Sequence, residues 1–401
     1  MDIIGIVAEY NPFHLGHLHQ LDSTKRHFPG DTPVVAVMSG DFVQRGEAAM
    51  YSKFARAEAA CRSGVDLVVE LPLPWALSSA EGFAQGAVGL LGSLGVTHLS
   101  FGSELGSAAP LEQLADILLD EQIYYIVKQR LKAQPELSFA AARELAVAEK
   151  SGELAQHLKM PNNILGVEYL KAIRKLKLPI EPFTVKRIGS AHDSAGTDGP
   201  KSASEIRQML GRGESIRGIV PERAEKVFEA ERGQGRELAD KSLMEIALLS
   251  RLRMLDKSAF EESADAGGGL GARIFEAVQS AATLDEVFER AKTRRYALSR
   301  VRRACLSAAL GIKEGMSAGA VPYARVLAAN ERGCALLRQI SENSPLPLIT
   351  KAAHVNRLSS DCTEVFATGA KAHDLYVLSY SQNQHRIAGQ DWRTGPQIVK
   401  N

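Results

Sequence analysis

The chain has 401 residues, of which 45% are hydrophobic and 24% are charged, and its formal net charge is +1. These values are ordinary for globular proteins and argue against a disordered chain or a fibre. Because the net charge is close to zero, a surface that binds nucleic acid would have to be a local basic patch. At this length we expect two or three domains with substantial cores.

Cysteine usage and the N-terminal segment indicate the cellular compartment. The segment MDIIGIVAEY has no basic residues before its apolar run, which is unlike a signal or transit peptide. No uninterrupted apolar run approaches the ~18 residues that span a bilayer. The cysteines form no CxxC pair, which favours reduced thiols over a disulfide framework or a zinc finger. We therefore expect a soluble, cytoplasmic protein with no membrane partner. The four cysteines are Cys61, Cys305, Cys334 and Cys362.

Short β-rich segments alternate with helical patterns through residue 104. Strands are predicted over 3–10, 33–40, 65–72 and 97–104, and helices over 16–28, 52–64 and 79–95. The first strand is continuously apolar, as expected for a strand that is buried on both faces. Because strand and helix alternate, we predict right-handed crossovers and a parallel sheet of the Rossmann-like α/β class.

Helical patterns dominate after about residue 110. One further strand is predicted over 180–188, and a polar loop over 189–203 leads to the helical segment SEIRQMLGRG. We predict an α/β domain over 1–212 with a helical insertion at about 110–178, followed by a mainly α-helical region over 213–401. The glycine-rich segment 264–272 reads as a mobile connection, and it is not a Walker phosphate loop because no Gly-Lys-Ser/Thr follows it.

The segment EYNPFHLGHLHQL, residues 9–21, lies at the junction of the first strand and the first helix. Ligands of open parallel sheets bind at the carboxyl ends of the strands, where a helix N-terminus offers unpaired N–H groups. His14 and His17 are three residues apart, so both rings can lie on the ligand side of a helix that begins near Leu15. Gly16 lacks the side chain that would keep a base or phosphate away from the backbone. This pattern predicts a phosphate site.

Three histidines within six residues could instead bind zinc or nickel. A metal site normally adds a fixed fourth ligand, and the glycine between His14 and His17 has no purpose in metal binding. We therefore expect no metal site here. His19 is expected to be a solvent-facing helix residue.

Two other polar segments leave alternatives open. The segment SGDFVQRGE could place Ser39, Gln44 or Arg45 at a substrate, or it could be a polar turn after a strand. Lys53 and Arg56 could contact phosphate, although a solvated helical face is the more frequent explanation.

Arginines are concentrated in KTRRYALSRVRRA, residues 292–304. A solvated helical face is the default interpretation of such a run. In a neutral protein, the same concentration also suits a local patch for a nucleic-acid backbone. The arginines are Arg294, Arg295, Arg300, Arg302 and Arg303.

Two motifs resemble those of a known superfamily. His-Leu-Gly-His resembles the HxGH signature of the nucleotidyltransferase superfamily, whose HUP-type α/β fold is shared with class I aminoacyl-tRNA synthetases. In that superfamily the two histidines contact the ATP phosphates. SASEIR resembles a second phosphate-binding element, and the resemblance makes Ser204 a helix cap that donates to phosphate and Arg207 a charged clamp.

A longer series of motifs resembles the bacterial tRNA(Met) cytidine acetate ligase family over nearly the whole chain. The motifs occur in the family's order: GIVAEYNPFHLGHLHQL, VAVMSGDFVQRGE, GVDLVVELP, FGSE, MPNNILGVEYLKAI and SASEIR. The resemblance implies that acetate is activated with ATP to acetyl-adenylate and that acetyl passes to N4 of the wobble cytidine of elongator tRNA(Met). It also implies Mg²⁺ as a companion of ATP, and it makes the C-terminal helical region the tRNA-binding part.

The resemblance also implies an ATP site and a catalytic set. The implied nucleotide-binding residues are Val7, Ala8, Glu9, Tyr10, Asn11, Pro12, Phe13, His14, Leu15, Gly16, His17, Leu18, His19, Gln20, Gly102, Asn162 or Asn163, Arg187 and Ile188. The implied catalytic residues are His14, His17, Ser204 and Arg207. An asparagine before an apolar helix is most often an N-cap, and capping and nucleotide contact are compatible if Asn162 and Asn163 divide these two functions. The sequence departs from the family at GSAHDS, where an aromatic residue is missing before His192.

Two other functions fit parts of the sequence. A small-molecule adenylyltransferase of the coenzyme A or NAD precursor type would share both phosphate motifs but would not need the long helical C-terminal region. A non-catalytic tRNA-binding protein should have lost one of the two histidines, Ser204 or Arg207, and all four are present.

Overall fold

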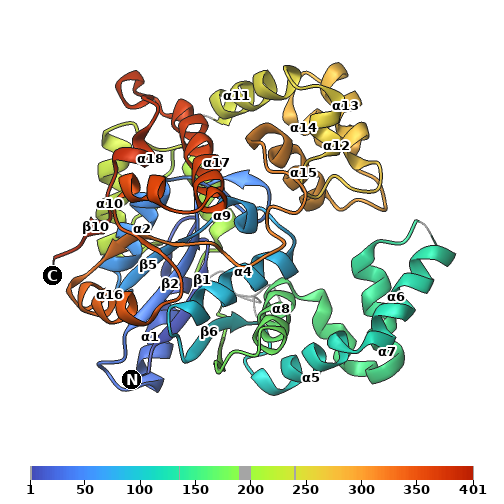
Figure 1. Ribbon diagram of the computed structural model, residues 1–401, viewed down its shortest axis with the longest axis horizontal. Helices are drawn as coiled ribbons and strands as arrows, with labels where there is room; N and C mark the ends of the chain where they lie inside the picture. The colour runs from blue at the N-terminus through green and yellow to red at the C-terminus, as the bar shows by residue number, and fades with distance from the viewer. Residues whose placement is uncertain (1, 135, 189–199, 239–240, 401) are drawn as a thin grey trace.

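The computed structural model describes residues 2–134, 136–188, 200–238 and 241–400, and an eight-stranded sheet forms its centre (Figure 1). The strand order is β10-β8-β5-β2-β1-β6-β7, and β9 pairs with β8. Neighbouring strands are parallel except for β5 and β8, which are antiparallel. The strands are β1 (Ile4–Ala8), β2 (Val34–Ser39), β5 (Leu67–Leu71), β6 (His98–Ser103), β7 (Glu181–Lys186), β8 (Ala324–Ala329), β9 (Leu348–Ile349) and β10 (Gln397–Ile398).

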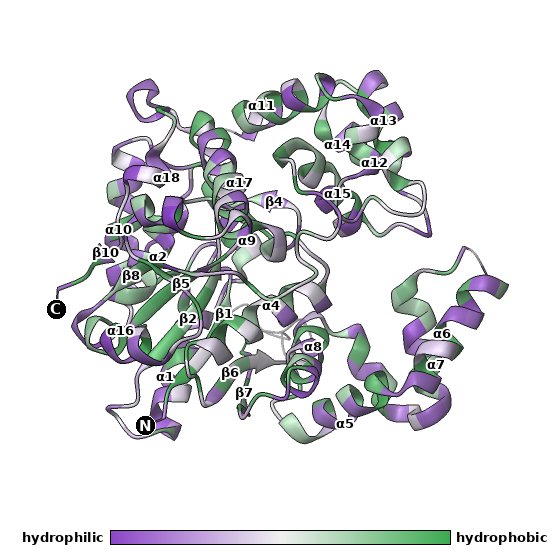
Figure 2. Cartoon of the chain, in the orientation of Figure 1, coloured by the Kyte–Doolittle hydropathy of each residue, from purple (hydrophilic) through white to green (hydrophobic). Residues whose placement is uncertain are grey.

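The sheet has a buried apolar layer on each face, because successive residues of a strand point to opposite sides. In β2, alternate residues belong to two different hydrophobic clusters, and both β2 and β5 are buried along their whole length. In β1, the strand for which burial on both faces was expected, the first three residues are buried and the last two are half-buried, where they reach the end of the sheet. Figure 2 shows hydrophobic residues concentrated in the strands and hydrophilic residues on the outer helices.

Helices cover both faces of the sheet. One cluster joins the sheet to α1 (Leu15–His27), α2 (Lys53–Arg62), α9 (Ala203–Gly211) and α10 (Glu222–Gly233). The other joins it to α4 (Ala80–Ser93), α8 (Pro161–Lys175) and α16 (Glu331–Asn343), with the short α3 (Leu73–Ala76) contributing to both. The predicted α/β class with a parallel sheet is confirmed, and the predicted strands and helices through residue 104 are present.

The predicted helical insertion contains α5 (Ala108–Leu119), α6 (Glu121–Ala133), α7 (Phe139–Ser151), a 3-10 helix (Gly152–Lys159) and α8. Helices α6 and α7 pack on each other around a small cluster of their own and project from the body of the molecule (Figure 1). Helix α8 packs closely on α4, so the insertion ends by rejoining the layer that covers the sheet.

The C-terminal region consists of a helical group and a part that joins the sheet. The helical group comprises α11 (Lys241–Arg253), α12 (Lys257–Glu261), α13 (Leu270–Ser280), α14 (Leu284–Ala291) and α15 (Leu298–Leu310). The remaining elements are β8, α16, β9, α17 (Ser360–Tyr376), α18 (Gln390–Arg393), β10 and three 3-10 helices (Ala352–Arg357, Val377–Ser379 and Asn383–His385). Because β8 pairs with β5, the sheet crosses the boundary predicted at residue 212. The division into domains stays a prediction.

Buried ion pairs tie the C-terminal elements to the sheet. The Nζ of Lys53 lies 2.9 Å from Glu70 and 2.7 Å from Asp391, and Arg325 on β8 binds the same two carboxylates. His373 on α17 lies 2.8 Å from Asp41. Charges this deep in a protein persist only when they are paired. The preferred interpretation of Lys53 as a residue on a solvated face is therefore wrong.

Arg56 is also buried, and that interpretation is wrong for it too. Its guanidinium donates to the carbonyl groups of Tyr51 at 2.9 Å and Ser39 at 3.2 Å, and also to those of Glu9 and Gly40. These contacts fix the ends of β1 and β2 relative to each other. A guanidinium has five N–H donors, so it can satisfy several buried carbonyl groups at a point where strands end.

The glycine-rich segment 264–272 consists of turns over 264–269 and the first turn of α13, and its contacts contradict the expectation of a mobile connection. Arg303 pairs with Asp265 at 2.6 Å, and Arg300 donates to Gly267 at 2.8 Å. A Cβ atom on Gly271 would lie 2.4 Å from the carbonyl oxygen of Phe260, so the glycine permits close backbone packing. Two of the five arginines proposed for a tRNA patch therefore hold this loop, whereas Arg294 and Arg295 are exposed.

No helix in the described part of the chain has both the length and the apolar character needed to cross a membrane.

Candidate active site

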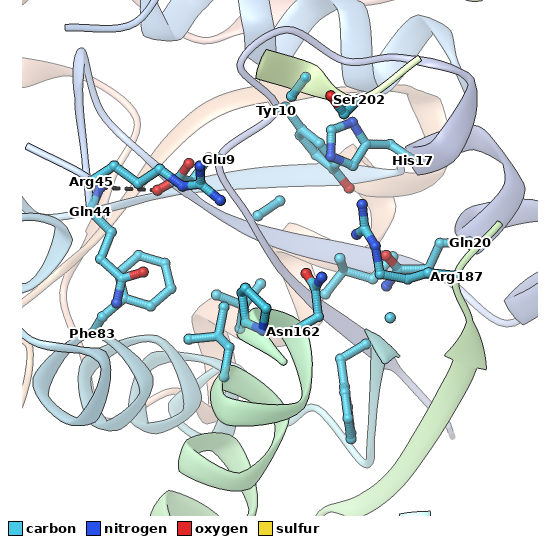
Figure 3. A pocket seen from close by; sticks show the side chains of 18 of the residues that line it. Glu9, Tyr10, His17, Gln20, Gln44, Arg45, Phe83, Asn162, Arg187 and Ser202 are labelled. Carbon is cyan, nitrogen blue, oxygen red and sulfur yellow. Dashed lines mark hydrogen bonds between the residues drawn. The ribbon is translucent and has the colours of Figure 1, made fainter. Parts of the chain in front are cut away.

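A cavity of about 510 Å³ lies at the carboxyl ends of β1, β6 and β7 (Figure 3). Its walls come from the end of β1, the first turns of α1, α4, α8 and α9, and the hairpin formed by β3 (Phe42–Val43) and β4 (Glu47–Ala48). In the sheet, β1 lies between β2, which follows it in the chain, and β6. The cavity therefore lies at the point where the strand order reverses. Parallel α/β sheets bind their ligands at this position.

The structure places most of the sequence-derived site residues at this cavity and others behind its wall. Those that line it are Val7, Ala8, Glu9, Tyr10, His14, His17, Gln20, Gly102, Asn162, Arg187, Ser204 and Arg207. Those outside its lining are Asn11, Pro12, Phe13, Leu15, Gly16, Leu18, His19, Asn163 and Ile188. Residues 189–199, which include His192 and the departure from the family pattern, lie outside the described residues.

The two histidines of the signature form the cap of helix α1. Nδ1 of His14 accepts a hydrogen bond from the backbone N–H of Gly16 at 3.0 Å, and Nδ1 of His17 accepts one from the backbone N–H of His14 at 3.2 Å. A neutral imidazole that accepts at Nδ1 carries its proton on Nε2. Each ring therefore has an Nε2–H group that it can donate to a ligand.

Both rings are neutral at physiological pH. Burial lowers the pKa of His14 to about 4, with Arg187 and Arg207 adding to the shift. Burial also holds the pKa of His17 well below its ordinary value, helped by His14 and Arg187. The ring centroids are 3.9 Å apart, a distance that disfavours two positive charges. The histidines thus act as hydrogen-bond donors, and the positive charge of the site comes from the arginines.

Gly16 does not have the function that was predicted from the sequence, which was to let a base or phosphate approach the backbone. The N–H of Gly16 is taken by His14, and that of Leu15 donates to Ile219 at 3.4 Å, so the imidazoles replace these backbone groups as donors. A Cβ on Gly16 would lie 2.7 Å from Cε1 of His14. Gly16 therefore makes room for a histidine ring, and it does not itself line the cavity.

Tyr10 and Phe13 support the histidine pair from behind. The Tyr10 ring meets the rings of Phe13 and His17 edge-on, with centroids 4.8 Å and 5.0 Å away. The backbone of Tyr10 has a φ of 46°, a region that bulky residues rarely occupy. Asn11 and Phe13 are buried, and the Asn11 side chain accepts from the backbone N–H of Met50 at 2.9 Å. These residues position the site without facing the cavity, except for Tyr10.

Arg187 and Arg207 supply positive charge near the histidines. Arg207 donates to the carbonyl group of Asn11 at 3.0 Å and pairs with Glu47 at 2.9 Å, which aims it across the start of α1. Arg187 follows β7 and lies beside Gly102, where a Cβ would meet its side chain at 3.3 Å. Burial lowers the pKa of Arg187, which nevertheless remains charged at neutral pH. Ile188 is 52% exposed and does not belong to the lining.

The first turn of α9 differs from the expectation in one respect. Ser202, not Ser204, is the N-cap residue. Its hydroxyl accepts a hydrogen bond from the backbone N–H of Glu205 at 3.3 Å, and the Glu205 carboxylate accepts one from the backbone N–H of Ser202 at 2.7 Å. The helix starts earlier because Ser202 and Glu205 have the spacing of a capping box. Ser204 lies within the first turn and lines the cavity.

Asn162 and Asn163 perform different tasks at the start of α8, and neither is its N-cap. Asn163 is buried, and its Oδ1 accepts from the backbone N–H groups of Glu104 and Leu105 at 3.0 Å and 3.3 Å. The Glu104 carboxylate accepts from the N–H groups of Asn162 and Asn163 at 3.2 Å and 2.8 Å. Only Asn162 lines the cavity, so it is the asparagine that can contact a nucleotide.

Some lining residues were not singled out in the sequence. Apolar side chains of α4, β6 and α8 form part of the wall, namely Phe83, Phe101, Ile164, Leu165 and Tyr169. The sequence does not distinguish them from core residues, because most of them also pack in the hydrophobic core. Gln44 and Arg45, for which a polar turn was the alternative, also line the cavity, whereas Ser39 is buried in β2.

The described residues contain no cluster of three or more His, Cys, Asp or Glu side chains arranged to hold a metal ion. The cysteines of the described chain are free, and three of them are buried.

Comparison with known proteins places the chain in a family. The family model described as HIGH Nucleotidyl Transferase matches residues 1–391. The chain is 38% identical to the tRNA(Met) cytidine acetate ligase of Thermoanaerobacter sp. (strain X514), covering 98% of each chain. It is 39% identical to the enzyme of the same name from Caldanaerobacter subterraneus, covering 95% of this chain and 96% of the relative.

Solved structures agree with these relatives. The crystal structure of Thermotoga maritima TmcAL bound with alpha-thio ATP superimposes with a TM-score of 0.92 at 30% identity, covering all of both chains. The apo structure of the same protein gives a TM-score of 0.93. The chain therefore belongs to the HIGH nucleotidyl transferase family and, within it, to the tRNA(Met) cytidine acetate ligases.

Proposed function

We propose that this protein activates acetate with ATP and transfers the acetyl group to N4 of the wobble cytidine of elongator tRNA(Met), forming N4-acetylcytidine. The observation that carries the proposal is the cavity in which the Nε2–H groups of His14 and His17 stand with Arg187 and Arg207. Such a set can bind a triphosphate and stabilise a leaving pyrophosphate without any protein nucleophile. The names of the relatives support the choice of acid and acceptor.

In the first step, one carboxylate oxygen of acetate attacks the α-phosphorus of ATP. A P–O bond forms to acetate, the bond from the α-phosphorus to the bridging oxygen breaks, and pyrophosphate leaves. Negative charge grows on the pyrophosphate, where the neutral imidazoles donate hydrogen bonds. Arg207 adds positive charge there, and Ser204 adds a hydroxyl donor. These donors are already in place in the folded protein, so little rearrangement is needed at the moment of reaction.

Mg²⁺ fits this chemistry as a companion of the triphosphate. It is usually held by substrate phosphates, water and one or two carboxylates, so a dedicated cluster of protein ligands is not required. Glu9 lines the cavity, and burial raises the pKa of its carboxyl group. When bound, the metal would neutralise phosphate charge; the chain's own residues orient the triphosphate.

In the second step, the exocyclic amine of cytidine attacks the carbonyl carbon of acetyl-adenylate. A C–N bond forms, the bond from the acyl carbon to the AMP oxygen breaks, and N4 loses one proton. The base must leave the anticodon stack to reach the cavity, as in other enzymes that modify bases. The helical group α11–α15 carries the exposed Arg294 and Arg295, which suit contacts to tRNA phosphates. A tRNA substrate is consistent with a cytoplasmic enzyme.

Acid-dependent exchange of pyrophosphate into ATP tests the proposal. A panel of formate, acetate, propionate and glycine should give exchange with acetate, in assays with and without tRNA(Met). Mass analysis of nucleosides from the treated tRNA should then show N4-acetylcytidine. No exchange with any acid and no acetylated cytidine would refute the proposal. Exchange that needs a phosphorylated small molecule in place of an acid would indicate the adenylyltransferase alternative.

A further inference from the structure

The cavity has two sides, and the nucleotide accounts for only one of them. On one side, Gly102 near the end of β6, Arg187 just after β7 and Asn162 in the first turn of α8 line the cavity together with the histidines at the start of α1. On the other side of β1, the β3–β4 hairpin brings Gln44 and Arg45 to the cavity (Figure 3). In the close view, Arg45 lies beside Glu9, and Gln44 reaches toward Phe83, away from Arg187 and His17.

Arg45 has no ion-pair partner among the described residues, although Glu9 lies beside it (Figure 3). Its side chain is exposed, and within the described residues it forms neither an ion pair nor a side-chain hydrogen bond. Arg207 on the opposite wall, in contrast, is held by Asn11 and Glu47. Burial raises the pKa of Glu9 and lowers that of Arg187, and the charge of Arg45 opposes the first of these shifts and adds to the second. An arginine held in a cavity without a protein partner is free to bind an anionic ligand.

The proposed reaction needs such a cation. A carboxylate and a triphosphate repel each other, so bringing an acid oxygen to the α-phosphorus requires positive charge on the acid side. A guanidinium matches a carboxylate because it can donate two parallel hydrogen bonds, which also fixes the orientation of the acid. We propose that the acid substrate binds in this second half of the cavity, with its carboxylate on Arg45 and its alkyl group against the apolar wall that contains Phe83.

The hairpin that carries Arg45 is fixed from two sides. The backbone N–H of Gln44 donates to Glu9 at 3.0 Å, which ties the hairpin to the end of β1. Gly46 has a φ of 76°, and a Cβ there would lie 2.6 Å from Cβ of Arg302 and 2.9 Å from N of Arg303. The turn therefore rests directly on α15. Because α15 belongs to the helical group proposed to bind tRNA, the acid subsite is in contact with the part of the protein that would receive the acceptor.

The apolar wall accounts for the size of the acid. Phe83 and Tyr169 are almost fully buried apart from the surface that they present to the cavity, and Leu165 lies with them in its lining. A pocket of this kind can accept a methyl group and reject longer chains by overlap, although one extra methylene is usually discriminated by only about 10- to 200-fold. Phe83 is accordingly the residue assigned to set the length of the acid.

Kinetics of acetate activation test the assignment, which rests on the proposed function. In Arg45→Met, the KM for acetate should rise by about 10- to 100-fold, the loss expected for hydrogen bonds to a charged group, while the KM for ATP changes less than about twofold. Arg45→Lys should recover part of the affinity. Added guanidinium ion should partly rescue Arg45→Ala. Arg338→Met, at an exposed arginine of α16, is the matched control and should behave as wild type.

Several outcomes would overturn the assignment. An unchanged KM for acetate, or a parallel rise of the KM values for acetate and ATP, would make Arg45 a structural or phosphate-binding residue. In Phe83→Leu, the ratio of kcat/KM for propionate to that for acetate should rise, and an unchanged ratio would remove Phe83 from the acid subsite.

A binding measurement separates this proposal from the proposed function. The NMR signal of ¹³C-acetate should broaden with wild-type protein and a non-hydrolysable ATP analogue, and should stay sharp with Arg45→Met. If wild type binds acetate through Arg45 but gives no exchange, the proposed reaction fails and the subsite stands. If wild type does not bind acetate, or if both proteins bind it equally, the subsite is refuted.

Discussion

Helices α1 and α8 both begin at the edge of the cavity, yet only one of them presents donors to a ligand. At α8 the Glu104 carboxylate already accepts from the first N–H groups, at 3.2 Å and 2.8 Å. At α1 the cap is a histidine, which takes the backbone N–H through Nδ1 and leaves Nε2–H for the cavity. A helix start is therefore an anion site only when the protein leaves its donors open, and histidine caps move those donors outward to where a phosphate can reach them.

The same difference explains what each helix can recognise. The start of α1 offers two neutral donors beside Arg207, which suits phosphate oxygens. The start of α8 carries a negative carboxylate, so it repels phosphate. Asn162 donates to Glu104 through Nδ2 at 2.6 Å and lines the cavity, where its amide suits a base or ribose. The two helix starts thus divide the nucleotide between a phosphate end and a nucleoside end.

The largest effect should come from removing a donor at α1. We expect His17→Ala to slow adenylate formation by at least about a hundredfold, because one preorganised donor to a developing oxyanion is worth that much in other enzymes. Binding of tRNA should be unchanged, because the arginines proposed to contact the tRNA phosphates belong to the helical group α11–α15 and not to the start of α1. Pyrophosphate exchange and a filter-binding assay with tRNA(Met) measure the two properties separately.

His19→Ala is the matched control for this substitution. His19 lies two residues further along α1 and does not line the cavity, so exchange should stay within about twofold of wild type. Loss of tRNA binding together with exchange in His17→Ala would indicate that the histidine is needed for folding, and the contrast between the two helix starts would then lose its functional meaning.

A smaller effect is expected from opening the cap of α8. Glu104→Ala leaves the N–H groups of Asn162 and Asn163 without their acceptor, and we expect the free energy of unfolding to fall by about 1–3 kcal/mol. The KM for ATP should rise as well, because Asn162 loses the contact that orients its side chain. Chemical denaturation and exchange kinetics measure these changes.

Glu81→Ala provides the comparison for Glu104. Glu81 lies in the first turn of α4, its side chain is 48% exposed, and it pairs with the exposed Lys175 at 2.6 Å and with Lys171 at 3.6 Å. Exposed pairs contribute at most about 1 kcal/mol, so this variant should be nearly as stable as wild type. If the free energy of unfolding fell by the same amount in both variants, Glu104 would be no more than a surface charge.

The sequence carries clear information about the first four strands and about the phosphate end of the site. Continuously apolar segments of about five residues between helical patterns predict central parallel strands, and the HxGH pattern predicts ligand-facing histidines on α1. Both predictions depend only on neighbouring residues. The cap of α9 also depends only on neighbouring residues. Ser202 and Glu205 have the spacing of a capping box, whereas the family motif favours Ser204 as the cap.

Other features depend on contacts between distant residues, which the sequence pattern does not contain. Strand β8, ARVLAA, is alanine-rich and has weak β propensity, and it is held by its pairing with β5. Lys53 begins a helix with an ordinary surface composition but meets Asp391, which is 338 positions away. Arg303 lies in an arginine-rich segment but forms an ion pair with Asp265. In each case the partner decides the environment of the residue.

The last effect concerns pH and tests whether the α1 donors are neutral. The pKa of His14 is about 4 in the folded protein and ordinarily 6.5, so the unfolded chain binds more protons between these values. The free energy of unfolding should therefore be fully retained above about pH 6.5 and should fall as the pH drops toward 4, by at most about 1.4 kcal/mol per pH unit for this one group. His14→Asn keeps an acceptor for the Gly16 N–H but cannot titrate, so its stability should fall less steeply over this range. His19→Asn is the control and should keep the wild-type slope. A slope in His14→Asn equal to that of wild type would show that His14 is not held neutral, and a charged imidazole would then have to replace the neutral donor at the start of α1.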